Sequence, residues 1–221
     1  MPAVPRRAAL VVVVSAAFLA LALGGRYAGE AYPRWLDALA LTLVRDWFPV
    51  PRGPVRAVIG LFDPVPLAVL VAVLAGARLL LGRRRLAVLA VAGPVLTGLV
   101  TTVLKPVIDR TKNGDLAYPS GHMGAAVALA VVLAMLVVNI ARLRGAAAVA
   151  VLVAPPVVVG ACLGLAMTVT NYHYLTDAVG GFCVAVAVVV GLALLLDGRW
   201  TRRTAATRVD PVGNVSRPLC D

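Results

Sequence analysis

The chain has few charged side chains for its length. Of its 221 residues, 14% are charged, 5% are aromatic and 61% are hydrophobic. A soluble domain carries about a quarter charged residues. One small water-soluble core cannot bury so much apolar surface, and a disordered chain has the opposite composition. The composition therefore excludes both classes and points to the membrane.

Cysteine, histidine and lysine are also scarce. Three cysteines (Cys162, Cys183 and Cys220) show no paired spacing, and the first two lie in apolar runs. They fit small packing residues better than a disulfide or a metal site. The chain has two histidines and two lysines against nineteen arginines, so the places of these four rare side chains are informative.

Six apolar runs are long enough for membrane spans, which take about 20 mostly apolar residues. We therefore predict an all-α integral membrane bundle of six transmembrane helices, spanning residues 1–198 as one domain. A basic cytoplasmic tail, residues 199–221, is expected to be disordered. The six runs are Ala8–Leu23, Pro64–Leu81, Leu86–Leu104, Met123–Ile140, Ala146–Met167 and Ala178–Leu196.

The net charge of +11 suggests a nucleic-acid partner until the charges are sorted by loop. With the N-terminus inside, the inner segments hold thirteen arginines against three aspartates, and the outer segments hold eight cations against seven anions. Positive charge is typical of cytoplasmic loops, so we predict that both termini are cytoplasmic. The basic tail then faces an anionic inner leaflet, and we expect no nucleic-acid partner.

The first run also has the basic start and the Ala20-Leu21-Ala22 segment of a cleavable signal peptide. Five further apolar runs favour an uncleaved span. Cleavage would leave an odd number of spans and disturb the charge distribution between the two sides.

Both lysines and both histidines fall in two outer loops, residues 105–122 and 168–177. In the first loop, Ser120 is expected to cap the helix that follows. The free amides of that helix end form a ready anion site, and Gly121 lets an anion approach the backbone. His122 can deliver a proton there. Helix capping and membrane anchoring remain simpler explanations of each residue alone.

In the second loop, His173 and Asp177 have the spacing that places two side chains on one face of a helix. The carboxylate can fix one ring nitrogen and leave the other as a nucleophile. An interfacial histidine beside a helix N-terminal aspartate is the alternative. With the cations Lys105, Arg110 and Lys112 nearby, the whole set fits phosphoryl transfer, in which stabilising charge on the phosphate oxygens dominates catalysis.

This set resembles the type-2 phosphatidic acid phosphatases, or lipid phosphate phosphatases, a family related to the vanadium haloperoxidases. The family pattern is Lys-x6-Arg-Pro, Pro-Ser-Gly-His and Ser-Arg-x5-His-x3-Asp. Lys105 matches the first lysine, residues 119–122 match the second motif in full, and His173 with Asp177 ends the third. The resemblance covers about residues 86–196. The departures are Lys112 and Asn113 in place of Arg-Pro, and Ala166-Met167 in place of Ser-Arg.

The resemblance implies that His173 attacks phosphorus to form a phosphohistidine, that Asp177 orients it, and that His122 protonates the leaving lipid alkoxide. It implies no metal and no other cofactor. The residues expected to bind the phosphate oxygens are Lys105, Arg110, Lys112, Ser120 and Gly121.

We therefore expect a lipid phosphate phosphatase in a bacterial cell membrane, with its active site on the extracytoplasmic face. The substrate is a phosphomonoester or diphosphate of a membrane lipid, such as a prenyl (di)phosphate or phosphatidic acid. The alternative is a catalytically weakened relative that binds lipid or assists transport, because Lys112 and Met167 replace family arginines. The lipid bilayer is the expected partner, and the oligomeric state stays open.

Overall fold

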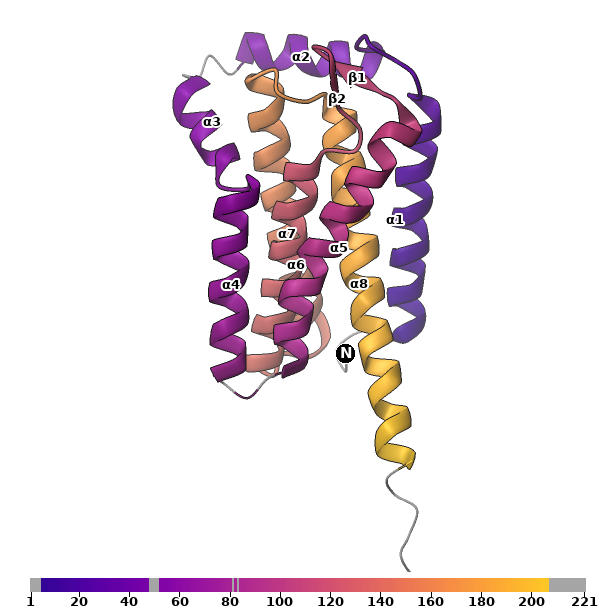
Figure 1. The fold of residues 1–221 in the computed structure, drawn as a ribbon, viewed down its shortest axis with the longest axis vertical. Helices are drawn as coiled ribbons and strands as arrows, with labels where there is room; N and C mark the ends of the chain where they lie inside the picture. Colours follow the sequence, from indigo (N-terminus) through magenta and orange to yellow (C-terminus); the bar gives the residue numbers. More distant parts are fainter. Residues whose placement is uncertain (1–4, 48–51, 81, 83, 207–221) are drawn as a thin grey trace, which may run out of the picture.

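Eight helices and one two-stranded ribbon form the part of the chain that the computed structural model describes, which is residues 5–47, 52–80, 82 and 84–206. The long helices stand side by side along the long axis, while α2 (Trp35–Trp47) lies across one end (Figure 1). The elements are α1 (Arg6–Arg26), α2 (Trp35–Trp47), α3 (Arg52–Gly60), α4 (Pro64–Leu80), α5 (Arg84–Ile108), β1 (Thr111–Lys112), β2 (Asp115–Leu116), α6 (Gly121–Ile140), α7 (Gly145–Val169) and α8 (Leu175–Ala206).

The predicted all-α membrane fold is confirmed, and each of the six apolar runs forms a helix. Five of the described helices are long and apolar enough to cross a membrane. The remaining run, α4, has 17 residues and reaches that length only with residues 53–60, from which it is bent by 51°. Helix α8 continues to Ala206, past the expected domain boundary at 198, and the rest of the predicted tail lies outside the described residues.

Helix α6 is the centre of the bundle. In its most apolar window 78% of the residues are buried, against 17% in α1 and in α7. Its neighbours are α5, α7 and α8. The peripheral helices keep large apolar side chains exposed, as lipid-facing helices do, and their backbone groups are satisfied within each helix. The core thus surrounds α6, which begins within the segment 119–122.

Two glycines bring the start of α8 against this loop. A Cβ atom on Gly181 would overlap the carbonyl oxygen of Ser120, and one on Gly180 would overlap the ring of Tyr118. Small residues commonly allow such close approach between membrane helices. The hydroxyl of Tyr118 donates a hydrogen bond to the carbonyl of Ala20, which joins α1 to the same contact. This packing sets the separation of the two loops that carry the histidines.

We expect Gly181→Ala to lower the stability of the fold by about 1–3 kcal/mol, because the added methyl group must displace the backbone of the facing loop. The matched control is Gly76→Ala in α4, where a Cβ meets nothing within 4 Å. That change should leave stability equal or raise it by up to about 1 kcal/mol. Thermal unfolding of the two variants in detergent would show the difference, and equal midpoints would contradict the expected clash.

Candidate active site

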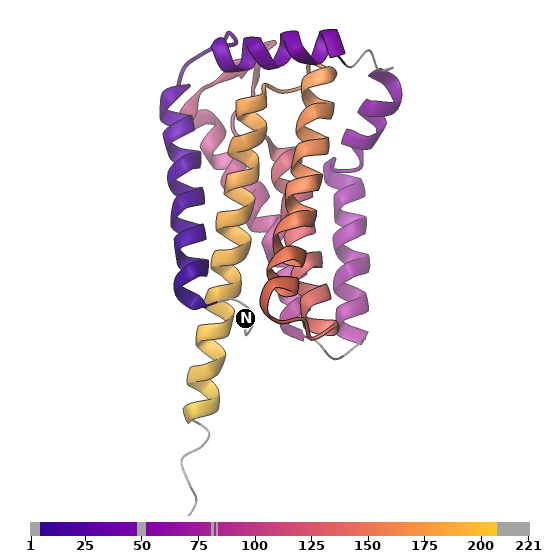
Figure 2. The ribbon, with the colours of Figure 1, turned by 180° about the vertical axis from the view of Figure 1, so that it is seen from behind.

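The two loops that carry the histidines meet at the end of the bundle that α2 covers, opposite the C-terminal end of α8 (Figures 1 and 2). The amide of Ser120 donates a 3.0 Å hydrogen bond to the carbonyl of Asp177, which fastens the loops together. The ring centroids of His122 and His173 are 6.5 Å apart. The ring of Tyr172 lies 5.3 Å from the first and 5.5 Å from the second. The sequence therefore identified two histidines that the fold brings together.

His173 lies beside Asp177, as their spacing predicts. Its Nδ1 atom is 3.6 Å from Asp177 Oδ2, within ion-pair range and slightly longer than a direct hydrogen bond. Burial lowers the pKa of His173, the carboxylate of Asp177 acts in the opposite direction, and the positive charge of Lys105 lowers it further. The lowered pKa favours the neutral imidazole, and a proton on Nδ1, which faces the carboxylate, would leave the lone pair on Nε2.

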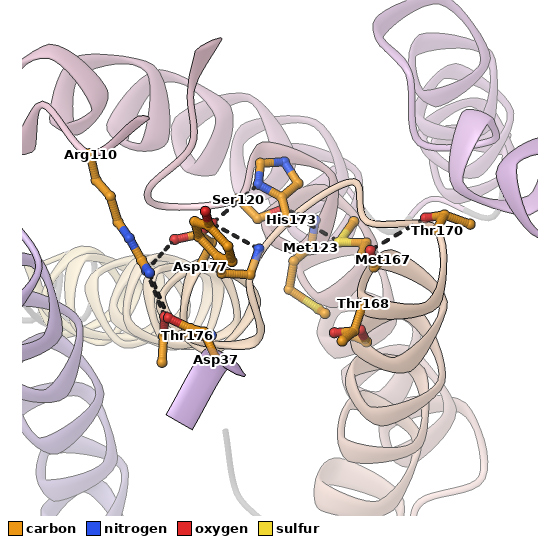
Figure 3. A network of polar contacts seen from close by, with 12 residues as sticks. Asp37, Arg110, Ser120, Met123, Met167, Thr168, Thr170, His173, Thr176 and Asp177 are labelled. Atoms are coloured by element: carbon orange, nitrogen blue, oxygen red, sulfur yellow. Dashed lines mark hydrogen bonds and ion pairs between the residues drawn. The ribbon is translucent and has the colours of Figure 1, made fainter. Parts of the chain in front are cut away.

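The sequence predicted that Arg110 binds phosphate, but in the structure its two terminal nitrogens bond to protein side chains. The side chain is fully buried, and its Nη1 atom donates hydrogen bonds of 2.6 Å to Asp177 Oδ1 and to Thr176 Oγ1 (Figure 3). Tyr27 and Tyr174 lie against the guanidinium, with ring centroids 4.3 and 4.7 Å from its carbon. Arg110 therefore holds the carboxylate that faces His173.

Asp37 completes this network, and the sequence did not single it out. It projects from α2, has no exposed surface, and accepts a 2.6 Å hydrogen bond from Arg110 Nη2. It also accepts 3.0 and 2.8 Å bonds from the amide and hydroxyl of Thr176. One signal could have found it. Val44 follows Asp37 by seven residues, or two helical turns, so the two side chains lie on the same face of α2. An apolar residue at this spacing indicates the inward face, and both residues are buried.

Lys112 is buried without a salt bridge. Its Nζ atom lies 4.1 Å from the centroid of the Tyr174 ring and has no hydrogen-bond partner within the part of the chain that the structure describes. Burial lowers the pKa of this amine to about 8, and the charges of Asp177 and Asp37 oppose the shift. An unpaired buried ammonium is costly, so the site is suited to an anion. Lys105, in the last turn of α5, is half-buried.

A tight hairpin explains one departure from the family motif. Strands β1 and β2 are joined by Asn113 and Gly114, both with positive φ, 53° and 89°. Such two-residue turns favour Asn-Gly. Proline, whose ring fixes φ at about −65°, cannot adopt the positive φ of Asn113. The Asn-Gly pair in the sequence is typical of such a hairpin. The hairpin places Lys112 beside Tyr174.

The structure gives Ser120 the capping role that the sequence predicted. Its Oγ accepts a 3.4 Å hydrogen bond from the amide of Met123 and lies 3.6 Å from Met167 Sδ. Because the amide of Ser120 also bonds to Asp177, neither polar group is directed to a ligand. The first-turn amides of Gly121 and His122, which a helix leaves without internal partners, remain for an anion. Met167 is fully buried, so no charge replaces the family arginine there.

A second carboxylate reaches the other histidine. Asp63 Oδ1 lies 2.7 Å from His122 Nε2, and Asp63 stands at the bend between α3 and α4. In the sequence this residue is one of several outer-face anions, and no local pattern links it to His122. Among the described residues there is no group of three or more His, Cys, Asp or Glu that could hold a metal ion.

The sequence profile of the PAP2 superfamily matches residues 86–201, slightly more than half of the chain. The chain belongs to the PAP2 superfamily. Its fold is similar to the crystal structure of a transmembrane PAP2-type phosphatidylglycerolphosphate phosphatase from Bacillus subtilis. The TM-score is 0.67 at 17% sequence identity, over 85% of this chain and 96% of that chain. No curated protein matches the chain significantly. Family and fold together support a multi-pass membrane phosphatase.

The residues of the site divide between the PAP2 region and the segment before it. The region 86–201 carries both histidines, both lysines, Arg110 and Asp177. The preceding segment supplies Asp37 and Asp63, one carboxylate for each half of the site. The N-terminal segment therefore contributes directly to the geometry of the PAP2 site.

We expect Lys112 to bind a phosphate group only while it is charged, below a pKa of about 8. The affinity for a soluble alkyl phosphomonoester should therefore fall as the pH rises from 7 to 9.5. The phosphomonoester itself titrates at about pH 6, outside the range of pH 7 to 9.5. Calorimetry with the His173→Ala protein, which cannot turn the ligand over through that residue, would measure the affinity.

The matched variant for this experiment is Lys112→Arg, whose guanidinium stays charged up to about pH 12. It should remove most of the fall in affinity across the same range. Lys112→Met should weaken binding about 10-fold or more at pH 7, the usual worth of a charged hydrogen bond, and should change it little at pH 9.5, where the wild-type lysine has lost its charge. Parallel pH curves for the wild-type lysine and the arginine would show that another group controls binding.

Proposed function

We propose that the protein is a lipid phosphate phosphatase that hydrolyses a phosphomonoester or diphosphate of a membrane lipid through a phosphohistidine. The observation that carries the proposal is the buried imidazole of His173 beside Asp177, with the second imidazole 6.5 Å away. A neutral nucleophile held by a carboxylate and a separate proton donor are the two groups that such a reaction needs.

In the first step, Nε2 of His173 attacks phosphorus in line with the bond to the lipid oxygen. The nitrogen–phosphorus bond forms as the phosphorus–oxygen bond breaks, and the ring becomes positively charged. Asp177 stabilises that charge from its position beside Nδ1. His122 transfers a proton to the leaving oxygen, which belongs to a lipid alkoxide in a monoester and to a lipid phosphate in a diphosphate, and Asp63 keeps its ring oriented through the 2.7 Å contact.

In the second step, water attacks the phosphohistidine. His122, now without its proton, accepts one from the water, and the nitrogen–phosphorus bond breaks to release inorganic phosphate. His173 returns to its neutral form with its lone pair restored. The same residue thus acts as general acid and then as general base, as microscopic reversibility requires of such a double displacement.

The phosphate oxygens are bound by Lys105, Lys112 and the first-turn amides at Gly121. Two ammonium groups and a helix N-terminus balance a dianionic headgroup. Arg110 and Ser120, which the sequence placed among the ligands, act indirectly by holding Asp177 and the start of α6.

The end of the bundle that carries the site faces away from the cytoplasm if the arginine distribution sets the topology. A lipid headgroup then reaches the site from the outer leaflet while its tail stays in the bilayer. The proposed location is the bacterial cell membrane. Prenyl phosphates, prenyl diphosphates, phosphatidic acid and similar lipids all meet these requirements.

One observation favours a second candidate, a weakened relative that binds lipid phosphate without turning it over. Met167 is fully buried against Ser120, at the position where the family motif carries a phosphate-binding arginine. A methionine there supplies no charge to the developing transition state. Turnover distinguishes the two candidates.

Purified protein in mixed micelles should release inorganic phosphate from at least one lipid of a panel that contains phosphatidic acid, phosphatidylglycerol phosphate, prenyl phosphate and prenyl diphosphate. His173→Ala should lose about 1,000-fold or more, because it removes the nucleophile. If wild type and His173→Ala release phosphate equally slowly from every lipid, while both still bind it, the weakened relative is the correct description.

Activity should be the same with excess chelator as without it, since the proposed steps use only side chains of the chain itself. The control is to add back magnesium, calcium, manganese and zinc separately to the chelated enzyme. Loss of activity with chelator that one of these metals restores would overturn the metal-independent mechanism while leaving the phosphatase function in place.

A further inference from the structure

Two buried carboxylates share one guanidinium at the base of the proposed site. Asp37, Arg110 and Asp177 have no exposed surface, and each carboxylate lies 2.6 Å from a different terminal nitrogen of the arginine (Figure 3). The three residues come from α2, from the turn after α5 and from α8. We call them the Asp37–Arg110–Asp177 relay.

The relay is held in a single geometry. A guanidinium is planar and presents its N–H groups in a fixed fork, so its position determines where both carboxylates lie. The rings of Tyr27 and Tyr174 lie 4.3 and 4.7 Å from its carbon. Thr176 donates to Asp37 and accepts from Arg110, which joins the two ends of the fork.

Asp177 has no freedom to turn within this arrangement. Its Oδ1 atom accepts from Arg110, and its Oδ2 atom accepts a 3.1 Å bond from the amide of Tyr174 while facing His173 at 3.6 Å. The direction of the carboxylate toward the nucleophile is therefore fixed by what fixes Arg110.

Asp37 also determines how much of the negative charge of Asp177 remains to stabilise the positively charged form of His173. With one cation between two carboxylates, the relay keeps one net negative charge, and Arg110 cannot neutralise Asp177 fully. Without the charge of Asp37, the guanidinium is free to form a bidentate pair with Asp177, the strongest pairing available to it. That pairing would draw the carboxylate away from His173 and reduce the stabilisation of its positively charged form.

We propose that Asp37 is a positioning residue of the catalytic site, acting through Arg110 on Asp177, so that α2 is part of the catalytic machinery. The inference rests on the proposed phosphatase function, because it assigns Asp177 the task of supporting the nucleophile. It extends the site beyond the PAP2 motifs to a helix outside the matched region.

The test compares Asp37→Asn with wild type on a lipid phosphate that wild type hydrolyses. Asparagine keeps the shape and can still accept from Thr176, but it removes the charge. We expect kcat to fall by about 10- to 100-fold, the usual effect of a misplaced catalytic group. KM and the inhibition constant for inorganic phosphate should change by less than about threefold, because the relay does not touch the phosphate.

The matched control is Asp46→Asn, the same chemical change at an exposed position of the same helix. It should keep the wild-type kcat. An Asp37→Asn enzyme with unchanged kcat overturns the inference. A rise in KM and in the phosphate inhibition constant without a fall in kcat does so too, because it would make Asp37 part of the phosphate site.

A second pair of variants keeps the test decisive if Asp37→Asn does not fold. Thr176→Val removes the hydroxyl that joins Asp37 to Arg110 and should lower kcat by about threefold or more. Thr176→Ser restores the hydroxyl and should restore most of the rate. Equal rates for the valine and serine variants would overturn the relay. His173→Ala is assayed beside them, so that absent turnover in wild type is recognised as failure of the proposed function.

Discussion

The arrangement of the site depends on one buried cation, Arg110. A guanidinium without solvent is tolerated only when its charge is balanced and its terminal nitrogens are hydrogen-bonded. Asp37 and Asp177 balance the charge, Thr176 accepts a further bond, and two tyrosine rings lie against the guanidinium. The Nε atom is buried and has no hydrogen-bond partner among the described residues. These partners come from separate parts of the chain, so balancing one side chain brings together α2, the turn after α5 and the start of α8. The geometry of the candidate site follows from that requirement.

The two departures from the family motifs differ in their effect on the charge of the site, where Arg110 is already bonded to carboxylates. Asn113 belongs to a hairpin that proline could not form, and the hairpin carries Lys112 to a buried position beside Tyr174. Met167, by contrast, fills its place with an apolar side chain and brings no charge. In the proposed function, the cations that bind the phosphate are therefore two lysines, while the nearby arginine bonds to carboxylates. Such a site would depend more strongly on pH than one built from arginines.

Several features were predictable because they depend on residues close together in the chain. The apolar runs predicted the six helices, and Ser120 was correctly identified as the cap of α6. The spacing of His173 and Asp177 predicted their contact. Arg110 and Ser120 were expected to bind phosphate, and the structure instead turns their polar groups to protein partners. The Asn113-Gly114 pair is typical of a hairpin turn, but the hairpin was not among the predicted elements.

The sequence by itself determined the membrane fold, the two loops of the candidate site and the local pairs within them. Helix periodicity and capping involve neighbours within about one turn, so composition and spacing contain that information. Only the tertiary structure decided the contacts of Asp37 and Asp63. Asp37 meets Arg110 across 73 positions, and Asp63 meets His122 across 59. Such pairs are set by how whole helices pack, through close contacts such as that of Gly181, and no local pattern of residues specifies them.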